Sequence, residues 1–444
     1  MVKIYPRLSQ ILSLVLLLTV AQPSDAQDST VILQLNDLVA QATSGNQNVL
    51  LAKIDEQIAA ANYKQTQAVF MPQAGLSYSA LSSNNPLYVF GFKLQQKSVS
   101  QQDFNPALLN NPSGKTDFIT QLNVQQPILN MDMLYMRKSV LKQTEVYQFK
   151  TQRTREQIIC QSQQAYLQLQ FAYETQKVLQ EALETTKAIY KFTSDRYAQG
   201  LLQKSDLLNV EVQIKTIETG LADIKSNIRN ASDYINLLMN KPPGVVYSTE
   251  PSIPFLDERS VIDTFLTDRA DFKAMETAIA SYDLLIKSSR MSYLPKVNAF
   301  ANYQLHDNTV PGFGAGAYMA GIQLSWDIFK GNATKNKIAT QKLERNKMAE
   351  DLNRLKEESR VELNKTYRLY MDAAFKIQQQ QAAIDFAKEA FRILQNRYLQ
   401  GLVNTTDVLL AQTQLSQQKL AYSEAVFNKN ISLAYYRFLT SRNK

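Results

Sequence analysis

The amino-acid sequence predicts a mainly α-helical chain with a minor β part, built from two tandem repeats of one plan. Three observations support this fold class: long segments without Gly or Pro, short segments in which apolar and polar residues alternate, and a motif that recurs at an offset of 201 residues. Each repeat is expected to contain a helix, a β-hairpin, a long helix, a helical hairpin tip and a second helix. The repeats span 27–240 and 258–444, and a Pro-rich connector at 241–257 joins them.

The composition describes a folded chain and excludes several classes of enzyme. Of the 444 residues, 45% are hydrophobic and 20% are charged, unlike the composition of a disordered chain. One His (His306) and one Cys (Cys160) cannot form a His- or Cys-rich metal site, a disulfide or a Cys/His catalytic pair. The net charge of +8 is scattered along the chain, so no nucleic-acid partner is expected. The chain is predicted to be no enzyme and to bind no cofactor.

The first 26 residues are typical of a secretory signal peptide. Lys3 and Arg7 precede the apolar run Ile11–Ala21, and small residues follow at Ser24–Ala26. The apolar run is too short to span a bilayer, which requires about 20 residues. We therefore expect residues 1–26 to be removed on export. No Cys follows the run, so attachment through a lipidated N-terminal Cys is not expected.

Two segments are long enough to form helices that no compact domain could contain. Residues 131–198 and 332–399 contain no Gly or Pro, and at ~1.5 Å per residue each would reach about 100 Å. In the second segment, apolar residues recur at seven-residue intervals, as in a coiled coil. They are Leu363, Tyr370, Ile377, Ile384, Phe391 and Tyr398. Both helices therefore need neighbours along one face while the other face stays in water.

Alternating apolar and polar residues predict two strands in each repeat. The expected strands are 73–81 and 117–126 in the first repeat, and 296–305 and 316–327 in the second. A turn-rich stretch, 82–116, connects the first pair, and an outer loop around Gly312–Gly316 connects the second, with His306 expected at its surface. From the strands alone, a soluble antiparallel sheet packed on one face remains possible.

The expected export of the chain favours a membrane β-barrel over a soluble sheet. Four aromatic side chains lie near the expected strand ends and suit a belt at the membrane interfaces: Tyr78, Tyr303, Tyr318 and Trp326. The polar alternates suit a water-filled lumen. Four strands cannot close a barrel, which needs at least about 8, so the chain is expected to associate, and three copies would supply twelve.

The repeated motif predicts two helical hairpin tips, at 199–206 and 400–407. Arg196–Gln213 recurs as Arg397–Gln414, with eight of eighteen positions identical. Gly200 and Gly401 can adopt the positive φ that ends a helix. Side-chain oxygens just after each Gly are expected to cap the next helix. The expected caps are Ser205 and Asp206 in the first tip and Thr405 and Thr406 in the second.

The duplicated order of these elements resembles the TolC-like outer-membrane efflux proteins. The resemblance rests mainly on Arg196–Leu208, Arg397–Leu409, Tyr293–Pro295 and Leu324–Phe329, and it covers nearly the whole mature chain. It implies a homotrimer in the outer membrane of a Gram-negative bacterium, with a 12-stranded transmembrane β-barrel and a long periplasmic α-helical barrel. It also implies a passive exit duct of a tripartite efflux or type I secretion system. The implied partners are a periplasmic adaptor protein and an inner-membrane transporter of the RND, ABC or MFS type.

The same resemblance assigns residues to docking and to the pore. Adaptor docking at the tips is implied for Gly200, Leu201, Ser205, Asp206, Gly401, Leu402, Thr405 and Asp407. A pore constriction is implied at Tyr398, Asp407 and Leu410. The sequence departs from the best-known pattern, which has an Asp at the place of Leu410 and an Arg at that of Val403. We therefore expect an apolar closure around Leu410.

Two other classes of protein are compatible with exported helical hairpins. A periplasmic coiled-coil adaptor also uses such hairpins, but it would lack the duplicated strand pair. An exported structural scaffold would keep the strands as a minor packed sheet. The pore-facing Gln, Asn, Ser and Thr residues do not indicate which cargo is carried.

Overall fold

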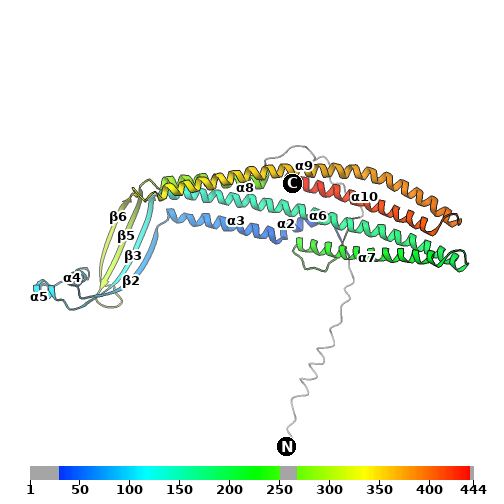
Figure 1. Ribbon diagram of the computed structural model, residues 1–444. Helices are drawn as coiled ribbons and strands as arrows, with labels where there is room; N and C mark the ends of the chain where they lie inside the picture. The colour runs from blue at the N-terminus through cyan, green and yellow to red at the C-terminus, as the bar shows by residue number, and fades with distance from the viewer. Residues whose placement is uncertain (1–29, 251–267, 441–444) are drawn as a thin grey trace, which may run out of the picture.

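The computed structural model describes residues 30–250 and 268–440 as an elongated molecule. A four-stranded sheet lies at one end, and two helical hairpin tips lie at the other (Figure 1). The predicted signal peptide, 1–26, and part of the expected connector, 251–257, lie outside the described residues.

Long and short helices are bundled along the axis of the molecule. Helix α6 (Met131–Ala198) has 68 residues and α9 (Ala333–Leu399) has 67, which gives each a length of about 100 Å. The shorter helices are α2 (Leu35–Gly45), α3 (Gln47–Gln65), α7 (Lys204–Leu238), α8 (Ala270–Met291) and α10 (Thr405–Leu439). Helices α3 and α8 run toward the sheet, whereas α7 and α10 run from the tips back to the middle (Figure 1). Across residues 30–250 and 268–440, none of the helices carries a stretch apolar enough to cross a membrane.

The seven-residue stripe of α9 lies in its contact with α10. Leu363 and Tyr370 are buried, and Leu363 shares an apolar cluster with Tyr436 of α10. The ring of Tyr367 lies 6.3 Å from that of Tyr436, measured between centroids. The period-seven pattern therefore identified the packed face of this helix.

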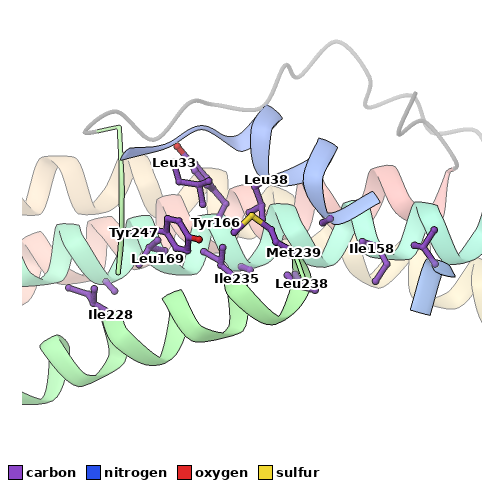
Figure 2. Packing of buried hydrophobic residues seen from close by; sticks show 14 of the residues in the cluster. Leu33, Leu38, Ile158, Tyr166, Leu169, Ile228, Ile235, Leu238, Met239 and Tyr247 are labelled. Carbon is purple, nitrogen blue, oxygen red and sulfur yellow. The ribbon is translucent and has the colours of Figure 1, made fainter. Parts of the chain in front are cut away.

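The largest apolar core lies at mid-length, where α2 and α7 pack on α6 (Figure 2). Two three-residue strands, β1 (Val31–Leu33) and β4 (Tyr247–Thr249), pair in parallel beside this core. The Tyr247 hydroxyl donates to Asn236 Oδ1 at 2.7 Å, and the Tyr173 hydroxyl donates to the Tyr247 carbonyl at 2.8 Å. This strand pair has no signal in the sequence, and β4 lies inside the expected connector. Three residues are too few to show an alternating pattern.

The second sheet has the order β2-β3-β5-β6, and all neighbours are antiparallel. Its strands are β2 (Gln73–Ser83), β3 (Lys115–Leu129), β5 (Lys296–Asp307) and β6 (Ala315–Ser325). The central pair joins the two repeats, because β3 belongs to the first and β5 to the second. The edge strands β2 and β6 have 11 residues each, and each has one side without a strand partner in the described chain.

The register separates an apolar face from a polar face. One row across the four strands consists of Leu76, Leu122, Tyr303 and Tyr318. The adjacent row, on the opposite face, consists of Ser77, Gln121, Gln304 and Ala317. Because successive side chains of a strand point to opposite faces, the alternation continues along the sheet, with Ile119 and Phe300 as apolar residues on the polar face.

The stretch between β2 and β3, expected to be turn-rich, contains short helices. These are α4 (Pro86–Gln95), the 3₁₀ turn η2 (Gln101–Phe104) and α5 (Pro106–Asn110). Asn85 Oδ1 accepts a hydrogen bond from the amide of Leu87, and Asn105 Oδ1 accepts one from the amide of Ala107. An Asn-Pro pair indicates a turn, but it also suits the cap and first residue of a helix. The expectation of turns alone was therefore incomplete.

Candidate functional site

Helices α6 and α9 end at the tips with the same backbone geometry. The amide of Gly200 donates to the Tyr197 carbonyl, and the amide of Leu201 donates to the Arg196 carbonyl, both at 2.9 Å. The second tip repeats both hydrogen bonds at 2.9 Å, 201 residues further on. This pair of bonds is the Schellman arrangement, which needs a left-handed residue. Gly200 has φ +74° and Gly401 has φ +76°, so the predicted conformation is confirmed.

The next helices start differently from the expectation. Helix α7 begins at Lys204 and α10 at Thr405, which makes Asp206 and Asp407 the third residue of each helix. Their carboxylates accept hydrogen bonds from the preceding cap amides, Gln203 N at 3.1 Å and Asn404 N at 3.3 Å.

The predicted caps Ser205, Thr405 and Thr406 were therefore wrong. These residues lie within the first helical turn, where their side chains are not placed to accept from it. The Ser205 hydroxyl lies 3.4 Å from the side-chain oxygen of Gln203, and that of Thr405 is bonded to Tyr398.

The residues assigned to adaptor docking differ in their exposure. Leu201 and Leu402 project from the two tips and are 64% and 61% exposed. Gly200, Gly401, Ser205 and Asp407 are also exposed, and Asp206 is half-buried. Thr405 is 1% exposed and faces the interior of the tip. The two leucines are thus the prominent apolar groups at the end of the molecule.

A chain of hydroxyl groups fastens the second tip to α6. The hydroxyl of Thr193 donates to the Ile189 carbonyl at 2.8 Å, so its oxygen is free to accept. The Tyr398 hydroxyl lies 2.7 Å from the Thr193 hydroxyl and 3.1 Å from that of Thr405. The order of donation is therefore from Thr405 to Tyr398, from Tyr398 to Thr193 and from Thr193 to the carbonyl. Tyr398 also meets the ring of Phe192 edge-on, with centroids 5.1 Å apart.

The three residues assigned to the pore do not share one environment. Leu410 is 67% exposed and Asp407 is exposed, whereas Tyr398 is 3% exposed. Tyr398 belongs to a buried apolar cluster with Ile189 and Val210. In this conformation Tyr398 lines no open space, and it would face a pore only after its hydrogen bonds break.

A second hydrogen bond, from a side chain to a main-chain carbonyl, links the two tips. Arg196, near the end of α6, donates from Nη2 to the carbonyl of Leu399 at the end of α9, at 3.1 Å. Its guanidinium lies over the ring of Phe192 at 4.7 Å and beside Gly401, where an added Cβ would lie 2.8 Å from Nη1. An arginine at a helix C-terminus satisfies a carbonyl that has no partner inside the helix.

The four predicted interface aromatics lie on the sheet at two levels. Tyr303 and Tyr318 face each other across β5 and β6, and Tyr78 lies two residues nearer the loop end. Trp326 follows β6 at the helical end, where its Nε1 donates to the Tyr293 carbonyl at 2.9 Å. All four are about half exposed or more. Seven residues of β5 separate Tyr303 from the helical end, or about 24 Å along the strand at ~3.4 Å per residue.

His306 is buried, contrary to its expected place on an outer loop. It lies on β5, is 3% exposed, and its Nδ1 is 2.7 Å from Asp117 Oδ2 on β3. Gln96, at the end of α4, donates to the other carboxylate oxygen of Asp117 at 2.9 Å. The cause is long-range, because β5 pairs with β3 and the residue after α4 bonds the same carboxylate. No local pattern around His306 could show this.

Solved structures of outer-membrane channels share this fold. A crystal structure of CusC, from work on the conformational changes that accompany its folding and transmembrane channel formation, matches with a TM-score of 0.79 at 15% identity, over 95% of each chain. The CmeC outer membrane channel of Campylobacter jejuni matches with a TM-score of 0.75 at 17% identity, over 91% of this chain and 85% of that one. The outer membrane protein VceC of Vibrio cholerae gives 0.74 at 18% identity, over 91% and 95%. The comparison with curated proteins finds no match.

A family model identifies the chain itself. The model of the outer membrane efflux proteins matches residues 38–241 and 261–434, which together cover both repeats. This decides against the adaptor and scaffold alternatives and confirms the resemblance on which the fold expectation was based. The chain therefore belongs to the outer membrane efflux protein family, whose members are channels of the outer membrane and not enzymes.

Proposed function

We propose that three copies of the chain form one channel, which carries cargo out of the cell as the exit duct of a tripartite efflux or type I secretion system. The observation that carries this proposal is the open sheet of a chain of this family: four antiparallel strands whose two edges have no partner within the described residues. The proposed trimer joins β6 of one copy to β2 of the next and closes a 12-stranded transmembrane barrel.

The edges of the sheet support closure by further copies. In a bilayer each unsatisfied backbone amide or carbonyl costs several kcal/mol, and only closure removes all edges. β2 and β6 have the same length of 11 residues, so they can pair along their full extent. Four strands are too few to close alone, because even small barrels need about 8.

The faces of the sheet support a barrel that spans a membrane. The row with Leu76, Leu122, Tyr303 and Tyr318 would face lipid, and the row with Gln121 and Gln304 would face the lumen. At the ~40° strand tilt of such barrels, the ~24 Å along the strand between the levels of Tyr303 and Trp326 corresponds to ~18 Å of height, most of their ~25 Å apolar band. We assign Tyr78, Tyr303, Tyr318 and Trp326 to the two membrane interfaces.

The tips are the proposed site of contact with a periplasmic adaptor. They lie at the end of the molecule opposite the sheet, where they would extend far into the periplasm (Figure 1). Leu201 and Leu402 supply exposed apolar groups for this contact. An inner-membrane transporter of the RND, ABC or MFS type would supply the energy.

The proposed constriction consists of Asp407 and Leu410, with Tyr398 held behind them in this conformation. Three symmetry-related carboxylates around a narrow axis would favour cations over anions. Three copies of Leu410 would add an apolar ring next to them. Tyr398 would join the pore wall only when Thr193 and Thr405 release its hydroxyl.

Light scattering of the full-length protein in detergent tests the assembly. A particle with the protein mass of three chains supports the proposal. A water-soluble monomer that needs no detergent would refute it. Deleting the chain from cells and measuring both drug sensitivity and secreted proteins separates the two roles. Efflux predicts a higher drug sensitivity, and secretion predicts the loss of a secreted protein.

Docking is tested by placing charge on the tips. The pair Leu201→Asp and Leu402→Asp should abolish export while the protein is still inserted in the membrane. The matched control is Leu108→Asp, which alters an exposed leucine of α5 at the other end of the molecule. Equal loss of export in the control would remove the tips as the docking site.

The ion selectivity of the channel tests the proposed pore constriction. Asp407→Ala should reduce the preference for cations in single-channel recordings. Because the Asp407 carboxylate also bonds the amide of Asn404, the control is Asp206→Ala, which removes the same kind of bond from the first tip. A change seen in both variants would indicate a capping effect, and no change in Asp407→Ala would exclude Asp407 from the pore.

A further inference from the structure

The two tips are local copies of each other. Helix α6 ends at Ala198 and α9 at Leu399, and α7 begins at Lys204 and α10 at Thr405. Each of these boundaries repeats at the offset of 201 residues, as do the turn hydrogen bonds between them. A contact made by one tip can therefore be compared residue by residue with its counterpart in the other.

One contact is made by only one of the two tips. Arg196 of the first repeat bonds the Leu399 carbonyl in the second, and the counterpart pair would be Arg397 with the Ala198 carbonyl. Arg397 is exposed, and within residues 30–250 and 268–440 it has neither an ion pair nor a side-chain hydrogen bond. Nor does a donor from the described chain reach the Ala198 carbonyl, although a helix C-terminus favours one.

The surroundings of the missing contact are exposed as well. Gly401 is covered by Arg196, whereas an added Cβ at Gly200 would meet nothing within 4 Å. Tyr197 is 39% exposed, whereas its counterpart Tyr398 is 3% exposed. The second tip is thus covered by the first repeat, whereas no part of the described chain covers the first tip in the same way.

The order of the helices indicates which helix of a neighbouring copy would pack against the exposed side of the first tip. At the tips α6 lies between α7 and α10, and α10 lies between α6 and α9, so α7 and α9 are the outer helices (Figure 1). Leu208 on α7 is 47% exposed, whereas its counterpart Leu409 on α10 is 8% exposed because it packs against α6. The counterpart of α6 is α9, so a second α9 on the outer side of α7 would repeat this packing.

An open groove lies along that outer side of α7. Its volume is about 910 Å³, and its lining includes Leu208, Val212 and Ile214. The polar atoms at its wall are already paired: Glu211 accepts a hydrogen bond from Tyr190 at 3.0 Å, which raises the pKa of the Tyr190 hydroxyl, and Lys215 bonds Glu218 at 2.9 Å. An apolar helix face suits this groove better than a charged ligand does. On α9, Phe386 is 76% exposed and Ile393 is 45% exposed.

We propose that Arg397 of one copy donates to the Ala198 carbonyl of the next copy and lies against its Gly200, so that a ring of alternating contacts within and between chains joins the periplasmic tips. The occupant of the α7 groove is α9 of that same neighbouring copy. The proposal rests on the proposed trimer and adds the residues that join its copies at the tips. Head-to-tail contacts of this kind close into a ring when the rotation between copies permits.

The chemistry of the contact tolerates the sequence differences between the repeats. The acceptor is a main-chain carbonyl, so it is present whether the residue is Leu399 or Ala198. The ring beneath Arg196 is Phe192, and its counterpart Ile393 offers an apolar surface for the arginine stem instead. By contrast, the hydroxyl bond of Tyr398 to Thr193 has no counterpart, because Leu394 occupies the position equivalent to Thr193.

Paired cysteines distinguish a contact between chains from one within a chain. The test variant carries Arg397→Cys with Gln199→Cys, and the matched control carries Arg196→Cys with Gln400→Cys, at positions shifted by 201 residues. Both are made with Cys160→Ala, and the full-length protein in detergent is treated with a short bis-maleimide. The test variant should give covalent dimers and trimers on a denaturing gel. The control should stay at the mass of one chain, with its internal cross-link found by peptide mass spectrometry.

Stability of the assembly gives a second readout. Arg397→Ala should lower the temperature at which the trimer dissociates in detergent without changing the helix content, and Arg397→Lys should restore part of the loss. Arg196→Ala removes the contact within the chain and should leave the dissociation temperature of the trimer nearly unchanged.

The outcomes separate this inference from the proposed function. Suppose that light scattering shows a trimer but the test variant gives no covalent oligomers, or that Arg196→Ala damages the trimer as much as Arg397→Ala does. Either result would overturn the role of Arg397 and leave the proposed trimer standing. A monomer by light scattering would overturn both.

Discussion

Removing one buried hydroxyl is expected to loosen the second tip. In Tyr398→Phe the donation from Tyr398 to Thr193 is lost, and the hydroxyl of Thr405, which is 1% exposed, loses its acceptor. Leaving a buried donor unsatisfied costs about 1–3 kcal/mol. The ring still packs beside Phe192, so the apolar contribution of the side chain is retained.

This cost can be converted into a change in opening. At about 1.4 kcal/mol for each factor of ten, 1–3 kcal/mol corresponds to a ~5- to 150-fold larger population of tips detached from α6. The effect should be local, because the hydroxyl chain joins only the end of α9, the start of α10 and one segment of α6.

Amide hydrogen exchange read by mass spectrometry measures this population directly. Peptides around 396–410 should exchange faster in Tyr398→Phe by a factor within that range, and single-channel recordings should show more frequent opening. The control is Tyr197→Phe, the same change in the first tip, where the hydroxyl has no bond to any described residue. If exchange at 396–410 is unchanged, or if both variants respond alike, the hydroxyl chain does not fasten the tip.

Three further predictions address other parts of the molecule. Burial raises the pKa of the Cys160 thiol to about 12, so at pH 8 a maleimide should label it only after unfolding. The hydrogen bond from Lys93 lowers the pKa of Asp103 to about 2. This pair should therefore stabilise the segment 84–114 fully above pH 3.8 and lose its contribution as the pH falls toward 2, which a spin label in the segment would report as rising mobility. In Asp103→Asn the segment should be mobile already at neutral pH. Ser281 is 2% exposed and bonded to Ser139 across α6 and α8, so Ser281→Val should lower the free energy of unfolding by about 1–3 kcal/mol in thermal denaturation, and an unchanged midpoint would contradict close packing there.

The features that the sequence predicted well are all local or periodic. The long helices follow from the absence of Gly and Pro over 131–198 and 332–399, and the stripe through Leu363 and Tyr370 follows from its period of seven. The tips follow from a glycine that must adopt a positive φ. Such patterns can be recognised because every residue that forms them lies within a few positions of the next.

The expectations that failed depended on an exact local count or on distant parts of the chain. The helix starts at Lys204 and Thr405 moved the capping role from the predicted hydroxyls to Asp206, which was among the predicted caps, and to Asp407, which was not. His306 was expected at the surface, yet it is buried on β5 against Asp117 of β3, 189 residues away.

The environment of Tyr398, one of the residues assigned to the pore constriction, could be read only from the folded chain. Repetition in the sequence shows that the two tips are alike, but it does not show that Tyr398 is buried while Tyr197 is exposed. That difference arises because the first repeat packs against the second tip within one chain, bringing Thr193 to a residue 205 positions away. Periodicity therefore assigns the helices and strands, whereas the burial and bonding of each tip depend on which segment covers it.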